Sequence, residues 1–325
     1  MSRIKLGFAV SSGASIVNLL DHLIYVKMTT RKDKSSFGDK RSRTSSAWLQ
    51  LSKRFLAEVN RLPTRSSTAY GIWRESGFRG IQRKIRDTRF VNHLRWTAAR
   101  NEAAAYRNWI ALYDTLSEYD RKAINIRIAQ LAYKPFFSVV MPVYNVDEVW
   151  LQSAIESVRK QLYPHWELCI ADDRSTKRHV QRVLDEYQRK DSRIKVTLRN
   201  SRGHISVASN SAVELAEGEF IALLDHDDEL TEHALYMVAE ELNAYPHADL
   251  IYSDEDKLDH RCRRVDPHFK SDWNPDLFYS YNFISHFGVY RRSVVNDLGG
   301  FREGYEGSQD YDLALRVIEQ IPEDH

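Results

Sequence analysis

From residue 135 onward, short apolar runs alternate with segments of helical periodicity. The apolar runs predict β-strands at residues 136–142, 166–171, 194–198 and 220–224. Between the runs, the spacing of apolar positions predicts helices at residues 147–161, 180–190 and 206–216. Strands that alternate with helices of this length are typical of parallel βαβ units, in which helices cover both faces of one sheet. The sequence therefore predicts an α/β domain over residues 135–325.

Residues 1–134 have a different character. Residues 27–47 are polar and charged and predict a linker. Helical periodicity predominates over residues 80–133, where aromatic side chains such as Tyr106 and Trp109 supply apolar faces for packing. Residues 6–26 are interrupted by polar positions and predict a helix that is too polar to span a membrane. We expect a mainly helical N-terminal region over residues 1–134.

Charge separates the same two parts of the chain. Residues 1–135 hold 26 Lys and Arg against 10 Asp and Glu, whereas residues 136–325 hold 21 against 35. Opposite signs favour two domains with different partners. The basic part could meet anionic lipid, another polyanion or the acidic part itself, or it could simply be solvated. The two cysteines, Cys169 and Cys262, form no disulfide framework, which favours a reducing cytosol.

Three carboxylates, Asp225, Asp227 and Asp228, crowd into four positions where the fourth predicted strand ends. Clustered carboxylates repel one another and are costly to desolvate unless a positive charge lies among them. Mg²⁺ and Mn²⁺ prefer oxygen ligands, and open α/β sheets bind ligands beyond the carboxyl ends of their strands. The alternative is that Asp228 caps a helix over residues 232–243. Because a cap accounts for one carboxylate and not three, we favour a metal–phosphate site.

Two further acidic clusters lie at predicted element ends. Asp172 and Asp173 follow the second strand, where a carboxylate can accept from a uracil or thymine N–H or a ribose hydroxyl, or can cap a helix. Asp310 and Asp312 open a predicted helix, where the helix dipole favours negative charge. Asp310 could instead be a general base that takes a proton from an acceptor hydroxyl. From the residues alone, both interpretations of each cluster stay open.

Other catalytic signatures are absent from the sequence. It has no Gly-rich loop ending in Lys-Ser or Lys-Thr, no G-x-G-x-x-G fingerprint and no serine nucleophile elbow. Aromatic and histidine side chains between the acidic clusters, among them Trp273, Tyr281 and His286, indicate either an acceptor groove or ordinary packing. The histidines show no zinc-ligand spacing with cysteine.

Four segments carry a resemblance to a known family: residues 138–145, 172–176, 224–228 and 309–313. They read SVVMPVYN, DDRST, LDHDD and QDYDL. In this order they resemble the signature of family 2 glycosyltransferases. The GT-A fold of that family is a Rossmann-like, mostly parallel sheet flanked by helices. The resemblance covers about residues 136–320.

The resemblance implies that a sugar is transferred from a nucleotide-diphosphate donor with inversion at the anomeric carbon. By motif position, Tyr144 would lie against the nucleotide base, and Asp173 would contact that base with Asp172 as its neighbour. Asp225 and Asp227 would form the D-x-D element of the family. Of these two, Asp227 is the expected direct ligand of Mn²⁺ or Mg²⁺, and Asp225 would lie near the ribose or the metal.

The resemblance extends to the proposed base and to a subgroup. Asp310 matches the position of the family's catalytic base, which often follows Glu and here follows Gln309. Residues 251–257 and 299–302 are similar to the bacterial branch that builds surface polysaccharides, including rhamnose-containing and O-antigen chains. In that branch a helical region often precedes the GT-A domain. Family members usually continue beyond the point where this chain ends, into a segment that closes the acceptor side and adds a metal-site histidine, so we expect a domain truncated at its C-terminus.

These features together predict an inverting, metal-dependent glycosyltransferase of cell-surface polysaccharide synthesis. It would transfer a hexosyl or deoxyhexosyl group to a glycan or lipid-linked acceptor, with no role for nucleic acid. We expect it to be cytoplasmic and attached peripherally to the anionic inner face of the cell membrane. One alternative is a catalytically impaired nucleotide-sugar-binding or scaffold protein. A nucleotidyltransferase is less favoured, because it should carry a basic, Gly-rich phosphate loop where this chain has residues 142–145.

Overall fold

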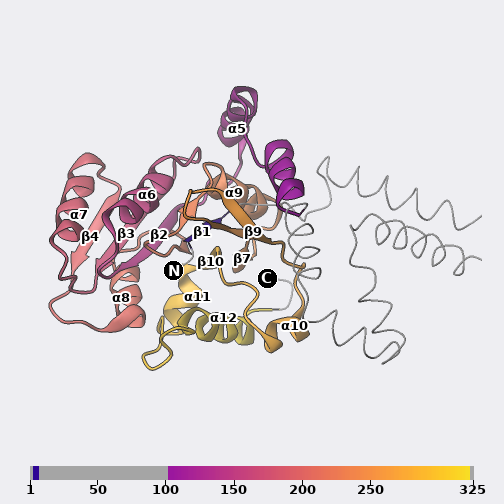
Figure 1. The fold of residues 1–325 in the computed structure, drawn as a ribbon. Coiled ribbons are helices and arrows are strands. Elements are labelled where there is room, and N and C mark those ends of the chain that lie inside the picture. Colours follow the sequence, from indigo (N-terminus) through magenta and orange to yellow (C-terminus); the bar gives the residue numbers. More distant parts are fainter. Residues whose placement is uncertain (1–2, 7–101, 323–325) are drawn as a thin grey trace, which may run out of the picture. The chain divides into compact units, whose positions relative to one another are not determined.

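The computed structural model describes residues 3–6 and 102–322, and the part from residue 105 onward forms one unit with the N-terminal strand. Its main sheet has six strands in the order β4-β3-β2-β5-β10-β7 (Figure 1). Four strands are parallel: β2 (Phe137–Val143), β3 (Trp166–Asp172), β4 (Ile194–Leu198) and β5 (Phe220–Leu223). The other two, β10 (Gly288–Arg291) and β7 (Leu250–Tyr252), extend the sheet in antiparallel fashion.

The predicted α/β architecture is confirmed. All four predicted strands are present, each within one residue of its predicted bounds at either end. Their burial explains why they were recognisable: every residue of β2 and β3 is buried, as expected of parallel strands covered on both faces. The two antiparallel strands were not predicted. They are only three and four residues long, which is too short for a periodic pattern.

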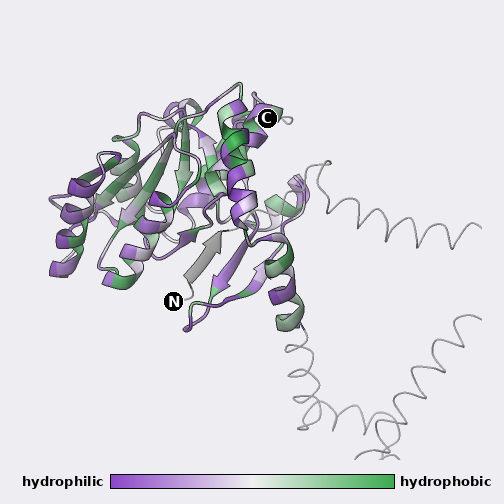
Figure 2. Ribbon diagram, turned by 90° about the horizontal axis from the view of Figure 1, so that it is seen from above, coloured by the Kyte–Doolittle hydropathy of each residue, from purple (hydrophilic) through white to green (hydrophobic). Residues whose placement is uncertain are grey.

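Helices cover both faces of the sheet. One face carries α6 (Glu148–Arg159), α7 (Arg178–Lys190) and α9 (Ala234–Ala244). The other face carries α8 (His204–Val213), α10 (Pro275–Ser280), α11 (Arg292–Asp297) and α12 (Gln309–Gln320). Figure 2 shows hydrophobic strands between helices whose outer surfaces are hydrophilic. The helices predicted at residues 147–161, 180–190 and 206–216 correspond to α6, α7 and α8, with ends shifted by at most three residues.

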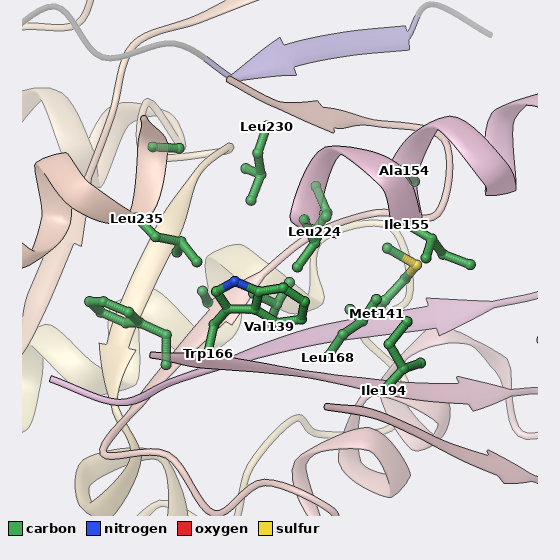
Figure 3. Close-up of a cluster of buried hydrophobic side chains, with 14 of the residues drawn as sticks. Val139, Met141, Ala154, Ile155, Trp166, Leu168, Ile194, Leu224, Leu230 and Leu235 are labelled. Carbon is green, nitrogen blue, oxygen red and sulfur yellow. The ribbon is translucent and has the colours of Figure 1, made fainter. Parts of the chain in front are cut away.

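Two hydrophobic cores follow from the alternation of side chains along each strand. Val139 and Met141 of β2 pack with α6, α7 and α9, whereas Val140 between them packs with α8 and α12. The first core surrounds Trp166, which is 1% exposed (Figure 3). The second core supports α12, which carries Asp310. The sheet therefore separates the layer of α6, α7 and α9, which is mainly structural, from the layer of α8 and α10 to α12, which includes part of the candidate site.

A second sheet of four strands lies beside the first. Its order is β6 (Glu229–Leu230), β1 (Arg3–Leu6), β8 (Glu255–Leu258) and β9 (Arg264–His268). The strand β1 lies within the region that was predicted to be mainly helical, and it ends at Leu6, where a helix was expected to begin. The rest of that predicted helix, the linker at residues 27–47 and most of the segment from 80 onward lie outside the described residues.

Two helices precede the main sheet, at residues 102–113 and at α5 (Glu118–Gln130). A capping box between Ser117 and Asp120 opens α5. Arg121 donates to Glu232 from Nε at 2.9 Å and from Nη2 at 2.7 Å, so α5 is tied to the segment before α9. The division of the chain at residue 134 stays a prediction. Among residues 3–6 and 102–322, no helix combines the length and apolar character that crossing a bilayer requires.

Candidate active site

The candidate site lies where the parallel strands end. Tyr144 follows β2, Asp173 follows β3 and Asp225 lies two residues after β5. Because these strands are parallel neighbours, their carboxyl ends meet at one edge of the sheet. The fold therefore brings together three of the segments that the sequence singled out, although they are separated by up to 80 residues along the chain.

Tyr144 and Asp173 line one cavity of about 200 Å³. Asp173 is buried, and its Oδ1 accepts hydrogen bonds from Nε of Arg199 at 3.0 Å and from the backbone N–H of Gly203 at 2.8 Å. The guanidinium of Arg202 lies 4.2 Å from the ring centroid of Tyr144, within the range of a cation–π contact. An aromatic ring, a fixed carboxylate and a cation thus share a small cavity of the size expected for a planar base.

Asp172 has a different environment from its neighbour. Its Oδ2 accepts a hydrogen bond from the backbone N–H of Ser175 at 3.1 Å, which braces the loop after β3. Its Oδ1 is buried and has no hydrogen-bond partner within the described structure. Asp172 does not line the cavity that Tyr144 and Asp173 share. The contact with Ser175 is a local structural role, and the predicted role of Asp172 beside the nucleotide stays a prediction.

Asp225, Asp228 and His286 form a cluster that could hold a metal ion. Each offers one ligand atom, and these atoms lie within 4.8 Å of one another. The nearest nitrogens of His286 are 3.9 Å from a carboxylate oxygen of Asp225 and 4.0 Å from one of Asp228. Carboxylate oxygens with one imidazole form a ligand set that suits Mn²⁺. The acidic strand end therefore gathers a histidine that lies about 60 residues further along the chain.

The negative charge of this cluster changes the pKa of His286. Burial alone would lower the pKa of its imidazole, but the nearby negative charges of Asp225, Asp228, Glu255 and Asp310 outweigh it, so the pKa is raised above its usual value. The site thus has a strongly negative local field that favours a positive charge. A bound cation would supply that charge in place of the proton.

The second carboxylate of this cluster is Asp228 and not Asp227. Capping of a helix at residues 232–243 was the alternative considered for Asp228, and the structure contradicts it: α9 begins at Ala234 and its N-cap is His233. Asp228 is buried, and its carboxylate lies next to His286. Asp227 is half-buried and lies outside the three-residue cluster. Its role as a direct metal ligand stays a prediction, while Asp225 belongs to both the predicted pair and the observed cluster.

Asp310 lines the same space as Asp225 and His286. It lies in the first turn of α12, and its Oδ2 accepts a hydrogen bond from Nδ2 of Asn282 at 2.8 Å. Asp310, Asn282, Asp225 and His286 all line one cavity of about 500 Å³. Gly307 precedes this helix with a φ of 91°, a conformation that glycine adopts without strain. The chain turns there so that the beginning of α12 points its carboxylate toward the acidic strand end.

The two cavities adjoin, because Pro142 and Ile205 line both of them. A ligand with a base at one end and a charged group at the other could therefore extend from Tyr144 and Asp173 to Asp225. Asp310 lines the larger of the two cavities together with Asp225. The adjoining cavities thus connect Tyr144 and Asp173 with the acidic strand end and with the carboxylate of Asp310.

Sequence reasoning did not single out Asn282 and did not place His286 at the acidic strand end, and it left Asp228 between the metal–phosphate site and a helix cap. His286 and Asn282 lie on the segment between α10 and β10, far along the chain from the acidic clusters that they meet. No local pattern marks them, because their proximity to Asp225 and Asp310 depends on the tertiary fold. For Asp228 the signal was present as a third carboxylate in the acidic run, but the motif pointed to Asp225 and Asp227 as the metal-binding pair.

Comparison with known proteins agrees with this geometry. The family model for glycosyl transferase family 2 matches residues 138–299. These residues form a family 2 glycosyltransferase domain. The predicted family is thereby confirmed, and the mostly parallel sheet with helices on both faces is the predicted GT-A fold. The matched range ends before Asp310, so the assignment does not rest on the proposed base.

Relatives of this glycosyltransferase domain are found in larger proteins. "Uncharacterized protein y4gI" of Sinorhizobium fredii is 51% identical over 205 residues, which are 62% of this chain and 23% of that protein. "O-antigen biosynthesis protein RfbC" of Myxococcus xanthus is 40% identical over 192 residues, 59% of this chain and 15% of that protein. The chain thus spans less than a quarter of the length of these two relatives.

Among solved structures, Staphylococcus aureus TarS (residues 1–349) shares 26% sequence identity with this chain. The match covers 56% of this chain and 55% of that one, with a TM-score of 0.46.

Proposed function

We propose that this domain transfers a sugar from a nucleotide-diphosphate donor to a hydroxyl group of a glycan or lipid-linked acceptor, in the synthesis of a cell-surface polysaccharide. The observation that carries the proposal is the shared cavity of Asp225, His286 and Asp310, next to the cavity of Tyr144 and Asp173. The smaller cavity would hold the base of the donor, and the acidic cluster would lie at its diphosphate. Asp310 would lie where the acceptor hydroxyl releases its proton. The names of relatives such as the O-antigen biosynthesis protein support the polysaccharide context.

The donor set at the acidic strand end fits a divalent cation. Asp225 and Asp228 offer hard carboxylate oxygens and His286 an imidazole, which suits Mn²⁺ better than Mg²⁺. A cation held there would offset the charge of the diphosphate as it leaves. The negative charges of Asp225, Asp228, Glu255 and Asp310, which raise the pKa of His286, would also attract a cation to this point. The predicted ligand Asp227 adjoins the cluster in sequence and stays a candidate.

Inversion at the anomeric carbon would follow if Asp310, which lines the same cavity as Asp225, is the single base. Asp310 would accept the proton of the acceptor hydroxyl while the oxygen of that hydroxyl forms a bond to the anomeric carbon. The bond from the anomeric carbon to the diphosphate breaks, and the nucleoside diphosphate leaves with the bonding electrons. Asn282 donates to Asp310 Oδ2 at 2.8 Å, which leaves the other carboxylate oxygen to receive the proton. Tyr144 and Asp173 would hold the base meanwhile.

A donor screen tests the proposal. The chain is incubated with Mn²⁺ and a panel of nucleotide-diphosphate sugars that differ in base and sugar, and the released nucleoside diphosphate is measured with and without EDTA. We expect metal-dependent release from one or a few donors that share a base. Tight binding of a donor with no release and no transfer would favour a nucleotide-sugar-binding or scaffold protein. Release that EDTA does not reduce would contradict the metal site.

We also propose that the basic N-terminal part holds the enzyme at the inner face of the membrane, near a lipid-linked acceptor. Residues 1–135 carry 26 basic against 10 acidic side chains, and each basic residue near an anionic surface contributes about 1 kcal/mol of attraction. We expect the chain to co-sediment with vesicles that contain anionic lipid, and the binding to weaken with salt. Equal binding to purely zwitterionic vesicles would contradict this attachment.

A further inference from the structure

A buried lysine lies behind the candidate site. The side chain of Lys270 is only 1% exposed, although an ammonium group is costly to bury without partners. Its Nζ has three acceptors: Oε2 of Glu255 at 3.2 Å, the carbonyl oxygen of Ile284 at 2.5 Å and the carbonyl oxygen of His286. Burial lowers the pKa of Lys270, and the charge of Glu255 opposes that effect. All three N–H donors of the ammonium are used, and two of their acceptors, the carbonyl oxygens of Ile284 and His286, lie on one loop.

The partner of Lys270 contacts the same loop. The side chain of Glu255 is 14% exposed, and its Oε2 also accepts the backbone N–H of His286 at 3.0 Å. Lys270 and Glu255 therefore bind the backbone of residue 286 from both of its polar groups, one through the carbonyl and the other through the amide. The backbone N–H of Lys270 in turn donates to Oδ1 of Asp254 at 2.7 Å, which fixes the lysine itself.

The loop held in this way, residues 281–287, bears two side chains of the site. His286 belongs to the cluster with Asp225 and Asp228, and Asn282 donates to Asp310. Asn282 also accepts the backbone N–H of Ser285 at 3.1 Å, so the two ends of the loop are linked internally. Lys270 and Glu255 are not among the described residues that line the 500 Å³ cavity. Their hydrogen bonds reach the cavity through the loop, and the charge of Glu255 also acts on His286.

We propose that Lys270 and Glu255 are positioning residues that set the place of both His286 and Asn282. One buried ion pair thereby couples the metal cluster to the orientation of the proposed base. The roles of His286 and Asn282 in this inference rest on the proposed function, whereas the control of the loop by the ion pair does not. A buried charge that loses its partner is strongly unfavourable, so removing one member should release the loop and not merely loosen one contact.

The test uses Lys270→Met, which keeps a long apolar side chain and removes the ammonium. Lys257→Met is the matched control, because Lys257 lies on the neighbouring strand β8 with its side chain 49% exposed and its nearest partner, Asp266, at 3.8 Å. Amide hydrogen exchange is measured along the full chain by mass spectrometry, and Mn²⁺ binding is measured by electron paramagnetic resonance of the free ion. A purely structural contribution would accelerate exchange over the whole domain.

For Lys270→Met we expect exchange about tenfold faster in residues 281–287 than in the wild type, with little change in β2 and β3. Mn²⁺ affinity should fall about tenfold, which is typical when the residue that orients a metal ligand is lost. Unchanged exchange in residues 281–287 would overturn the inference. Faster exchange in the loop with unchanged Mn²⁺ affinity would overturn the link to the metal cluster.

A second variant keeps the inference testable if Lys270→Met does not fold. Glu255→Gln retains an oxygen that can accept the His286 N–H but leaves Lys270 without a charged partner, so exchange in the loop should rise by a smaller factor. If amide exchange in the loop of Glu255→Gln were no faster than in the wild type, that result would count against the inference. If the wild type binds no Mn²⁺, the metal site of the proposed function fails, while the exchange result alone still decides whether the ion pair holds the loop.

Discussion

Replacing Asp310 with asparagine is expected to lower kcat for sugar transfer by about 10³-fold, since general-base catalysis typically contributes 10²–10⁴-fold. Asparagine keeps the size of the side chain and can still contact Asn282, but it cannot accept the proton of the acceptor hydroxyl. The Kd for the donor should stay within about twofold of the wild type, because Asp310 does not line the cavity of Tyr144 and Asp173, where the base would bind. Steady-state kinetics and calorimetric titration of the donor measure the two quantities separately.

A matched control comes from the same helix. Glu319→Gln changes an exposed carboxylate at the other end of α12 and should leave both kcat and donor affinity unaltered. If Asp310→Asn retained more than about a tenth of the wild-type rate, another group would have to take the proton. If it weakened donor binding as strongly as it slowed transfer, Asp310 would belong to the donor site and not to the acceptor side.

Replacing Asp225 with asparagine is expected to weaken Mn²⁺ binding by about 10–100-fold and to reduce nucleoside diphosphate release in parallel. Asp225 is the one carboxylate that belongs both to the predicted D-x-D pair and to the cluster with His286. The exchange removes one negative charge while keeping the shape of the side chain. Free Mn²⁺ measured by paramagnetic resonance gives the affinity, and release at saturating Mn²⁺ shows whether added metal restores the activity.

Comparing Asp227→Asn with Asp228→Asn tests which of the two residues supplies the second carboxylate ligand of the metal. The geometry favours Asp228, whose carboxylate lies 4.0 Å from His286, whereas the motif favours Asp227. On the geometry we expect the larger loss of Mn²⁺ affinity in Asp228→Asn. A larger loss in Asp227→Asn would support the D-x-D assignment and would mean that the side chains rearrange when the metal and diphosphate bind. No loss in Asp225, Asp227 or Asp228 variants would remove the metal from this strand end.

The central part of the fold could be predicted because its strands carry their own signal. Residues 137–143 and 166–172 are buried throughout and mostly apolar, since both faces of these strands are covered. The edges of the sheet carry no such signal. Strand β7 is half-buried and three residues long, and β6 has two residues, so both exist through pairing with partners that are distant in sequence. Short strands of this kind depend on tertiary contacts and not on local pattern.

The candidate site divides in the same way. Asp173, Asp225 and Asp310 each lie at the end of a regular element, so their place in the sequence indicated a place in the fold. Asn282 and His286 lie on a loop whose course depends on the buried Lys270–Glu255 pair, and no spacing rule relates them to the acidic clusters. Predicting them would have required knowledge of the packing between β9, β10 and α12.

The two cores on either side of the main sheet have a practical consequence for engineering this enzyme. Adjacent positions of one strand, such as Val139 and Val140, belong to different cores. Substitutions intended to raise thermal tolerance can therefore be confined to the layer of α6, α7 and α9, which carries none of the side chains that line the two cavities. Substitutions intended to change the accepted donor or acceptor belong to the opposite layer. Thermal stability and substrate specificity can therefore be optimised in separate libraries of variants, even though some of the positions concerned are adjacent in sequence.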